Sequence, residues 1–295
     1  MRTYEVALDG TLAGLTVEQV LRRSLHMSKT QVKRAKFRPD GLLLDGERVN
    51  STHRVRQGQI LRVTLPERER SRVEPAPGPV NIVWEDRWLA VVDKPAGLPV
   101  HPGRGHYRDT LANHLLWYFE QRGQSLVPRF VNRLDRGTSG LLVFALSAES
   151  QTCLQELLHT PKFVRRYLAI GQGEPPQEEG EIRLPLEKRP GTLNTYQVAK
   201  TGRPAQTRYR VVERRGGYSL FSLTLGTGRT HQIRVHLSAL GCPLAGDALY
   251  GGGEELARPA LHASQITLCH PFTHQSLRLT SPPPEDLSRF WRNLP

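Results

Sequence analysis

The segment FVNRLDRGTSGLLVFAL, residues 130–146, decides the predicted fold around the site. Its first half is polar and turn-like, and its second half is an apolar run typical of a buried strand. Asp135 lies at the entrance to that strand, where a rigid element would hold its carboxylate as catalysis requires. The alternative is a surface turn in which Asp135 pairs with a neighbouring arginine.

The surrounding segments predict an α+β fold. Residues 110–122 and 148–160 have helical periodicity, with Ser147 as an N-cap of the second helix. Strand-like runs are SGLLVFAL, YLAIGQG, TRYRVVE and YSLFSLTL. Because the strands and helices do not alternate regularly, we expect a mixed, largely antiparallel central sheet with flanking helices.

A second polar segment, LGTGRTHQIRVHLSALG, spans residues 225–241. A loop bracketed by glycines precedes a helix-like run, and it offers Arg229 as a cation and Thr230, His231 and Gln232 as hydrogen-bonding groups. The alternative is a solvated loop followed by a basic helix.

Residues 67–80, ERERSRVEPAPGPV, are charged and then rich in Pro and Gly, so they predict a linker. It would separate a small N-terminal α/β domain, residues 1–66, from a larger domain, residues 81–295. The small segment has twelve Lys or Arg against six Asp or Glu, a net charge of +6. Positive charge is therefore concentrated at the N-terminus.

Within residues 1–66, the segment 15–25 predicts an amphipathic helix capped by Thr16. A second helix is predicted to start near Ser28, with Lys29, Lys33 and Lys36 on one face. Two strand-like runs follow, and Asp45-Gly46 breaks the first of them as a hairpin turn. The basic helix face is either an RNA-binding surface or simply a solvated one.

The chain has 295 residues and a formal net charge of +13, which favours nucleic acid as a partner. The alternative is that the charge only aids solubility. We expect no membrane span and no signal peptide. The odd, widely spaced cysteines Cys153, Cys242 and Cys269 indicate reduced thiols, hence a cytoplasmic protein. We expect it to be a monomer.

Metal sites are not expected. Cys269, His270 and His274 are interrupted by a proline and lack a partner cysteine pair. His231 and His236 are five residues apart, not the four of a helical zinc pair.

Two resemblances add to these patterns. The two helices, the hairpin carrying DGERVN and the closing GQILRV of residues 14–64 resemble an S-four-type RNA-binding domain. The R-L-D-x-x-T-S-G-L-L pattern at 133–142 and T-G-R-T-H-Q-I-R-x-H at 227–236 resemble the RluA/RluD-type family of RNA pseudouridine synthases. RRYLAI at 165, GRPAQTRYRV at 202, GDALYGG at 246 and LHA at 261 continue the family's order, so the resemblance covers residues 80–284.

The family resemblance implies the pseudouridine synthase fold and assigns roles to residues. Asp135 would be the catalytic aspartate, Tyr167 the active-site tyrosine and Arg229 the arginine that pairs with the aspartate. Asn132 stands where many members have His, and Gly137 where an acidic residue is frequent. The predicted RNA-contacting residues are Arg133, Asn132, Thr138, His231, Gln232, Lys29, Lys33 and Lys36.

The implied reaction isomerises uridine in RNA, so it requires no cofactor or metal. Asp135 would attack the sugar or remove a proton from it, and the patterns do not choose between these roles. The nucleotide must be flipped out of its stack. Large-subunit ribosomal RNA is the expected substrate, with transfer RNA as the alternative.

Two other classes of function compete. One is a catalytically silent RNA-binding factor in ribosome assembly, which the presence of Asp135, Tyr167 and Arg229 together argues against. The other is an Asp-dependent hydrolase of nucleosides or glycosides, which would need a second carboxylate beside Asp135.

Overall fold

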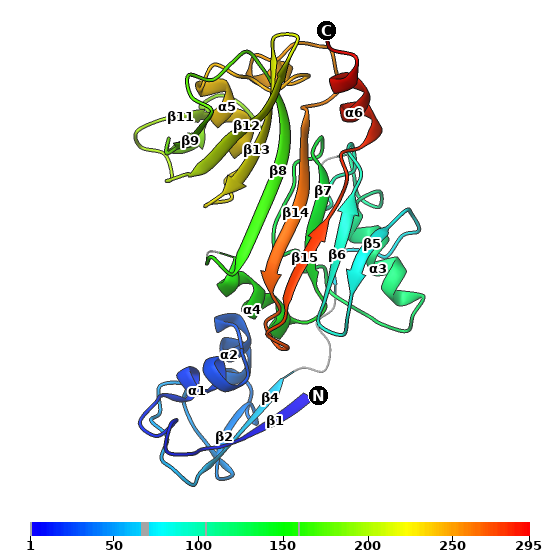
Figure 1. The fold of residues 1–295 in the computed structure, drawn as a ribbon. Helices are drawn as coiled ribbons and strands as arrows, with labels where there is room; N and C mark the ends of the chain where they lie inside the picture. The colour runs from blue at the N-terminus through cyan, green and yellow to red at the C-terminus, as the bar shows by residue number, and fades with distance from the viewer. Residues whose placement is uncertain (1, 66–70, 104, 159) are drawn as a thin grey trace.

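The computed structural model describes residues 2–65, 71–103, 105–158 and 160–295. Figure 1 shows a small N-terminal part beside one end of a larger part built on a long, twisted sheet. Each part has its own buried apolar cluster. The two clusters share no residue.

The N-terminal part is a four-stranded antiparallel sheet with two helices. Its elements are β1 (Arg2–Ala7), α1 (Val17–Ser24), α2 (Lys29–Lys36), β2 (Leu42–Leu44), β3 (Glu47–Arg48) and β4 (Ile60–Leu65), in the sheet order β1-β4-β2-β3. Val20 and Val32 from the helices pack against Leu61 and Val63 of β4. The predicted helices and hairpin are confirmed, whereas β1 was not predicted.

Local sequence signals set the boundaries of these elements. The side chains of Thr16 and Ser28 each accept a hydrogen bond from the backbone N–H of the glutamine three residues later. The side chain of that glutamine accepts a hydrogen bond from the backbone N–H of the cap residue. Asp45 and Gly46 have φ of 51° and 87°, as a tight hairpin turn with two left-handed residues requires.

The larger part, in the described residues, contains a nine-stranded sheet, a small two-stranded sheet and four α-helices. Its elements are β5 (Asn81–Glu85), β6 (Leu89–Lys94), α3 (Leu111–Glu120), β7 (Ser139–Ala145), α4 (Ala148–Leu157), β8 (Phe163–Gln172), β9 (Glu179–Ile182), β10 (Leu186–Lys188), β11 (Tyr196–Val198), β12 (Thr207–Arg215), β13 (Tyr218–Leu225), α5 (Gln232–Ala239), the 3-10 turn η1 (Ala248–Tyr250), β14 (Leu261–Cys269), β15 (Ser276–Thr280) and α6 (Glu285–Arg292). The sheet order is β5-β6-β7-β14-β8-β13-β12-β9, with β15 on β14. Among the strands that the structure describes, only β7 and β14 pair in parallel, so the predicted α+β, largely antiparallel fold is confirmed.

Strand β7 lies near the middle of this sheet, and all seven of its residues are buried. Alternate residues therefore feed two apolar clusters, with Leu142 and Phe144 on one face and Leu141 and Val143 on the other. The loop that carries Asp135 enters the sheet at this strand. The site is thus held by the most buried element of the molecule.

Residues 71–80 of the predicted linker lie against α3, and residues 67–70 lie outside the described part. The backbone N–H of Ala76 donates to the Asn113 carbonyl, and Asn113 Nδ2 donates to the Glu74 carbonyl at 2.7 Å. The second half of the segment thus packs on the larger part. Where the domains divide remains a prediction.

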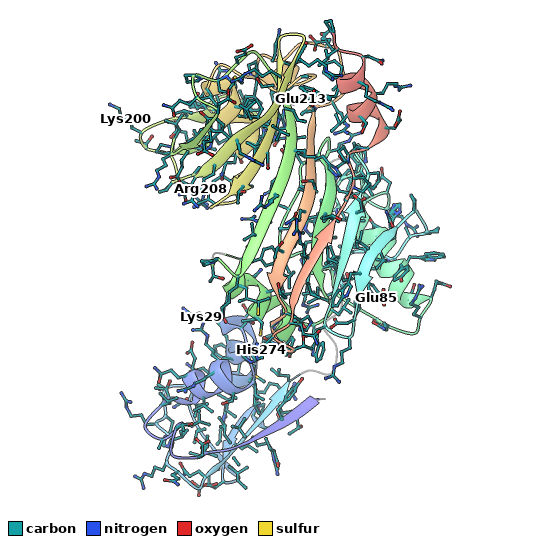
Figure 2. All side chains as sticks on the ribbon, viewed as in Figure 1. Lys29, Glu85, Lys200, Arg208, Glu213 and His274 are labelled. Atoms are coloured by element: carbon teal, nitrogen blue, oxygen red, sulfur yellow. The ribbon has the colours of Figure 1, made fainter. Side chains whose placement is uncertain are left out.

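The two parts touch through α2. Gln31 Nε2 donates to Glu149 Oε1 of α4 at 3.2 Å, and the His26 ring meets the Phe272 ring edge-on at 6.3 Å. In Figure 2, Lys29 lies at the end of α2 nearest the larger part. None of the helices described is both long and apolar enough to cross a membrane.

Candidate active site

Asp135 is fixed through the backbone of its own loop. Asn132 Oδ1 accepts the Val143 N–H of β7 at 2.9 Å, and Leu134 is buried beneath the loop. The Thr138 N–H donates to the Asp135 carbonyl, which closes the turn. The Asp135 side chain is 20% exposed, so it is held firmly yet remains open to a ligand.

Lys94 supports the other side of the loop. It is fully buried at the end of β6, and its Nζ donates to the carbonyls of Pro95, Leu98 and Arg136 at 2.8–3.1 Å. Burial lowers the pKa of Lys94 to about 7, while the charge of Asp135 opposes that shift. Lys94 therefore ties two loops together directly behind Asp135.

Two groups from the second polar segment face the Asp135 carboxylate. Arg234 Nη1 lies 3.7 Å from Asp135 Oδ2, and His231 Nε2 lies 3.8 Å from the same oxygen. These distances allow electrostatic attraction but are too long for hydrogen bonds. The Asp135 carboxylate is therefore paired electrostatically with these two groups but is not tied to either of them by a hydrogen bond.

Arg234 is anchored by a buried carboxylate. Its Nε and Nη2 donate to the two oxygens of Asp247 at 2.7 Å each. Burial alone would lower the pKa of Arg234, but the Asp247 bonds and the Asp135 charge raise it. The guanidinium is thus a permanent cation with one nitrogen turned to Asp135.

The pairing predicted for Arg229 is found at Arg234 instead, which corrects that assignment. Arg229 lies in the loop before α5, where its side chain is exposed and its Nε donates to the Pro204 carbonyl at 3.1 Å. Arg234 lies in the first turn of α5, which faces the Asp135 loop. Arg229 lines the same cavity, but its guanidinium is directed to another partner.

His231 begins α5 in the left-handed conformation, with φ of 55°. Tyr250 OH accepts a hydrogen bond from the Tyr196 N–H and lies within hydrogen-bond distance, 2.8 Å, of His231 Nδ1. Burial lowers the pKa of His231, which favours the neutral ring. Nε2 is the ring nitrogen that lies on the Asp135 side.

Tyr167 lies on β8 and lines the same cavity, with 3% of its surface exposed. Burial raises its pKa, and the charge of Asp135 adds to this while Arg165 opposes it. The side chain is therefore a neutral phenol at neutral pH. Its ring offers a flat apolar surface for a base.

These groups line one cavity of about 1050 Å³. Its described lining includes a single carboxylate, Asp135, and the five arginines Arg133, Arg136, Arg165, Arg229 and Arg234. A cavity with this charge favours a polyanionic ligand. Its size suits a nucleotide turned out of an RNA strand.

The other predicted site residues divide into three groups. Asn132, Thr138, His231 and Gln232 line the cavity, and Arg133 lies exposed at its rim. All four polar contacts of Gln232 go to the protein, namely Thr227, the Arg229 N–H, Gln206 and Thr207. Gln232 thus shapes the loop rather than offering a free group. Lys29, Lys33 and Lys36 are exposed on α2 and do not join the cavity.

The sequence patterns missed Arg234, Asp247 and Tyr250 as members of the site. All three lie inside motifs that were noticed, T-G-R-T-H-Q-I-R-x-H and GDALYGG. Nothing in their spacing shows that residues 234 and 247 meet. Among the described residues, no three His, Cys, Asp or Glu side chains are grouped to hold a metal ion.

Comparisons with known proteins agree with this geometry. The model of the family described as RNA pseudouridylate synthase matches residues 88–239. The ribosomal large subunit pseudouridine synthase D of Nitrosomonas europaea is 37% identical, over 99% of this chain and 89% of that protein. An uncharacterized RNA pseudouridine synthase of Bacillus subtilis, YhcT, is 33% identical over 99% of this chain and 97% of its own.

Solved structures give the same result. The human RNA pseudouridylate synthase domain containing 4 superposes with a TM-score of 0.59 at 26% identity, over 72% of this chain and 92% of that one. For human RNA pseudouridylate synthase domain containing 1, the TM-score is 0.57 at 27% identity, over 73% and 86%.

Proposed function

Since the chain belongs to the RNA pseudouridylate synthase family and is an isomerase, we propose that it converts uridines of large-subunit ribosomal RNA to pseudouridine. The choice of RNA rests on relatives named as ribosomal large subunit pseudouridine synthase D. The observation that carries the chemistry is the single carboxylate, Asp135, in a cavity otherwise rich in arginine.

In the proposed reaction Asp135 is the catalytic carboxylate. The N1–C1′ bond of uridine breaks, the base turns, a C5–C1′ bond forms, the C5 proton passes to solvent, and N1 takes up a proton. Asp135 either attacks the sugar or takes a proton from it. The Arg234 guanidinium attracts this carboxylate from 3.7 Å, and His231 Nε2 lies 3.8 Å from the same oxygen. No cofactor or metal takes part.

Tyr167 would stack on the flipped uracil. Its buried ring lines the cavity and shares the face of β8 that lies toward Asp135. Because the pKa of Tyr167 is raised, little of its phenolate, the form that could accept a proton, is present at neutral pH. We therefore assign it base stacking first, and removal of the C5 proton only through a short-lived phenolate.

The N-terminal part would act as an S-four-type RNA-binding domain. Its support is the exposed basic face of α2, with Lys29, Lys33 and Lys36, on a small independently packed core. Contacts of this kind bind phosphates and add affinity without choosing sequence. We further propose a monomer working in the cytoplasm, consistent with its free thiols.

Tritium release from RNA containing 5-tritiated uridine tests the reaction. The parent should release tritium from large-subunit ribosomal RNA, also in the presence of EDTA. Asp135→Asn should reduce release by orders of magnitude while binding RNA as well as the parent, because an amide is neither the nucleophile nor the base required. Glu120→Gln, which removes a charge at an exposed helix end, should remain active.

The outcomes separate the competing functions. Robust release by Asp135→Asn would show that the carboxylate is not the catalyst. No release by the parent from ribosomal or transfer RNA would favour the silent assembly factor. Carbodiimide mapping of pseudouridines in a deletion strain should show a missing large-subunit site, and a missing transfer-RNA site would reassign the substrate.

A further inference from the structure

Arg165 is a buried cation that the proposed chemistry leaves without a task. It is 5% exposed, lies on β8 two residues before Tyr167, and lines the cavity. Residues two apart on a strand extend from the same face, so Arg165 and Tyr167 share a wall. The pKa of Tyr167, which burial raises, is lowered in part by the nearby Arg165 charge.

The guanidinium of Arg165 has no counter-ion in the part of the chain that the structure describes. Its Nε has no hydrogen-bond partner there, and no carboxylate lies within ion-pair distance. Its Nη1 lies under the TGRTHQ loop, 3.2 Å from where a side chain on Gly228 would begin. A buried charge without a counter-ion is unfavourable, so binding of an anion beside Arg165 would be favourable.

Asn132 supplies a second unpaired donor in the same cavity. It is 5% exposed, and its Oδ1 is engaged by the Val143 N–H. Among the described residues its Nδ2 has no partner. One cavity therefore holds two buried donor groups without acceptors, and one of them is charged.

We propose that Arg165, assisted by Asn132 Nδ2, binds a phosphate of the flipped uridine nucleotide. The inference rests on the proposed function, because it places that nucleotide in this cavity. Uracil also offers acceptors, but its carbonyls are neutral and would leave the Arg165 charge uncompensated. Arginine binds phosphate through two parallel N–H···O bonds, and a phosphate supplies both charge and acceptors.

This contact would position the sugar. A phosphate held against β8 fixes the backbone of the flipped nucleotide while Tyr167 receives its base. The C1′ atom is then placed between these two anchors and Asp135. Arg165 is therefore a substrate-binding residue, and the reaction depends on it through position rather than proton transfer.

Binding of uridine and of its 5′- and 3′-monophosphates to the full-length protein, measured by NMR titration, tests the proposal. The parent should bind at least one monophosphate about tenfold more tightly than uridine. Arg165→Met, which keeps length and removes charge, should bind all three compounds equally. Arg166→Met is the matched control, since Arg166 is the exposed neighbour on the opposite face of β8 and should keep the preference.

Asn132→Asp provides a variant that preserves the fold. It retains the acceptor for the Val143 N–H but replaces the donor with a negative group, so the preference for phosphate should vanish. Thermal unfolding verifies that each variant is folded.

Two results would overturn the assignment. One is a parent that binds the monophosphates no better than uridine. The other is an Arg165→Met protein that keeps the preference, or that loses uridine and monophosphates by the same factor. Because these titrations do not measure turnover, absence of tritium release from every RNA would reject the proposed function without bearing on them.

Discussion

At the residue scale, a second carboxylate holds one arginine in place beside Asp135. Arg234 Nε and Nη2 donate hydrogen bonds to Asp247, and this orients Nη1 toward Asp135. Lysine has no such fork, so Arg234→Lys keeps the charge but loses its position. We expect single-turnover rates to fall about a hundredfold or more, with RNA affinity within a few-fold.

Arg229→Lys is the control for this prediction. Its side chain is exposed and bonded to the Pro204 carbonyl, so its loss should reduce the single-turnover rate by no more than a few-fold. A large loss at Arg229 together with a small one at Arg234 would restore the pairing expected from sequence. Measuring both rates at saturating RNA separates chemistry from binding.

Lys94 predicts a pH dependence of stability. Its pKa is about 7 in the folded protein against 10.5 for an ordinary lysine, so between these values the unfolded chain binds the proton more tightly. Stability from this group therefore rises with pH from about 7 to 10.5, by at most about 1.4 kcal/mol per unit, and is constant below 7.

Urea unfolding of the parent and Lys94→Met measures that dependence. The free energy of unfolding of the parent should rise relative to that of Lys94→Met from pH 7 to pH 9.5. Parallel curves over this interval would show that the Lys94 ammonium is not destabilised by burial.

Some residues of the site could be predicted from their sequence motifs, and others could not. Asp135 and Tyr167 were predicted, and the structure brings them to one cavity, because each stands alone in its motif. Arg229 and Arg234 stand in the same motif. Only the start of α5 at Gln232 decides which of them turns inward, and sequence leaves that boundary open.

At the scale of elements, the close approach of β7 and β14 holds the site together. Gly140 has φ of 107°, and a Cβ there would meet the Ala263 carbonyl oxygen at 2.3 Å. Gly140→Ala should cost about 3–5 kcal/mol, combining backbone strain with overpacking between the strands. Chemical denaturation of the full chain measures this cost.

Gly123→Ala is the matched comparison. Its φ is 74°, but no atom lies within 4 Å of an added Cβ. Only the left-handed strain of about 1–2 kcal/mol should remain. If both substitutions lowered the free energy of unfolding equally, the close contact between β7 and β14 would not contribute to the cost at Gly140.

Elements with strong local signals were predictable, and those defined by pairing were not. Thr16 and Ser147 cap their helices as predicted, and α2 starts after Ser28 as predicted. Thr110, which was not predicted as a cap, caps α3. Strand β14 was missed, since LHASQITLC mixes polar and apolar residues and gains its form between β7 and β8. Its pairing with β7 joins residues more than a hundred positions apart.

At the scale of the whole molecule, we propose that chemistry and RNA affinity belong to different parts of the chain. The cavity lies in the larger part, while the basic α2 belongs to a second core that meets it through Gln31 and His26. The division at the Pro- and Gly-rich segment, which the sequence predicts from charge and composition, stays a prediction. The sequence could not predict that residues 71–80 would pack on α3, because that contact depends on Asn113 and His114.

Replacing Lys29, Lys33 and Lys36 together with glutamine tests the division. All three are exposed, so the fold should be unchanged. If each contacts a phosphate, the slope of log affinity against log salt should become shallower by roughly 2 to 3. The single-turnover rate at saturating RNA should stay within a few-fold of the parent, because Asp135 and the cavity are untouched.

Glutamine at Arg289 and Arg292 of α6, at the far end of the molecule in Figure 1, is the control and should leave the slope unchanged. An unchanged slope in the lysine variant would mean that the basic face of α2 does not contact RNA. A large fall in the rate at saturating RNA would mean that α2 takes part in catalysis.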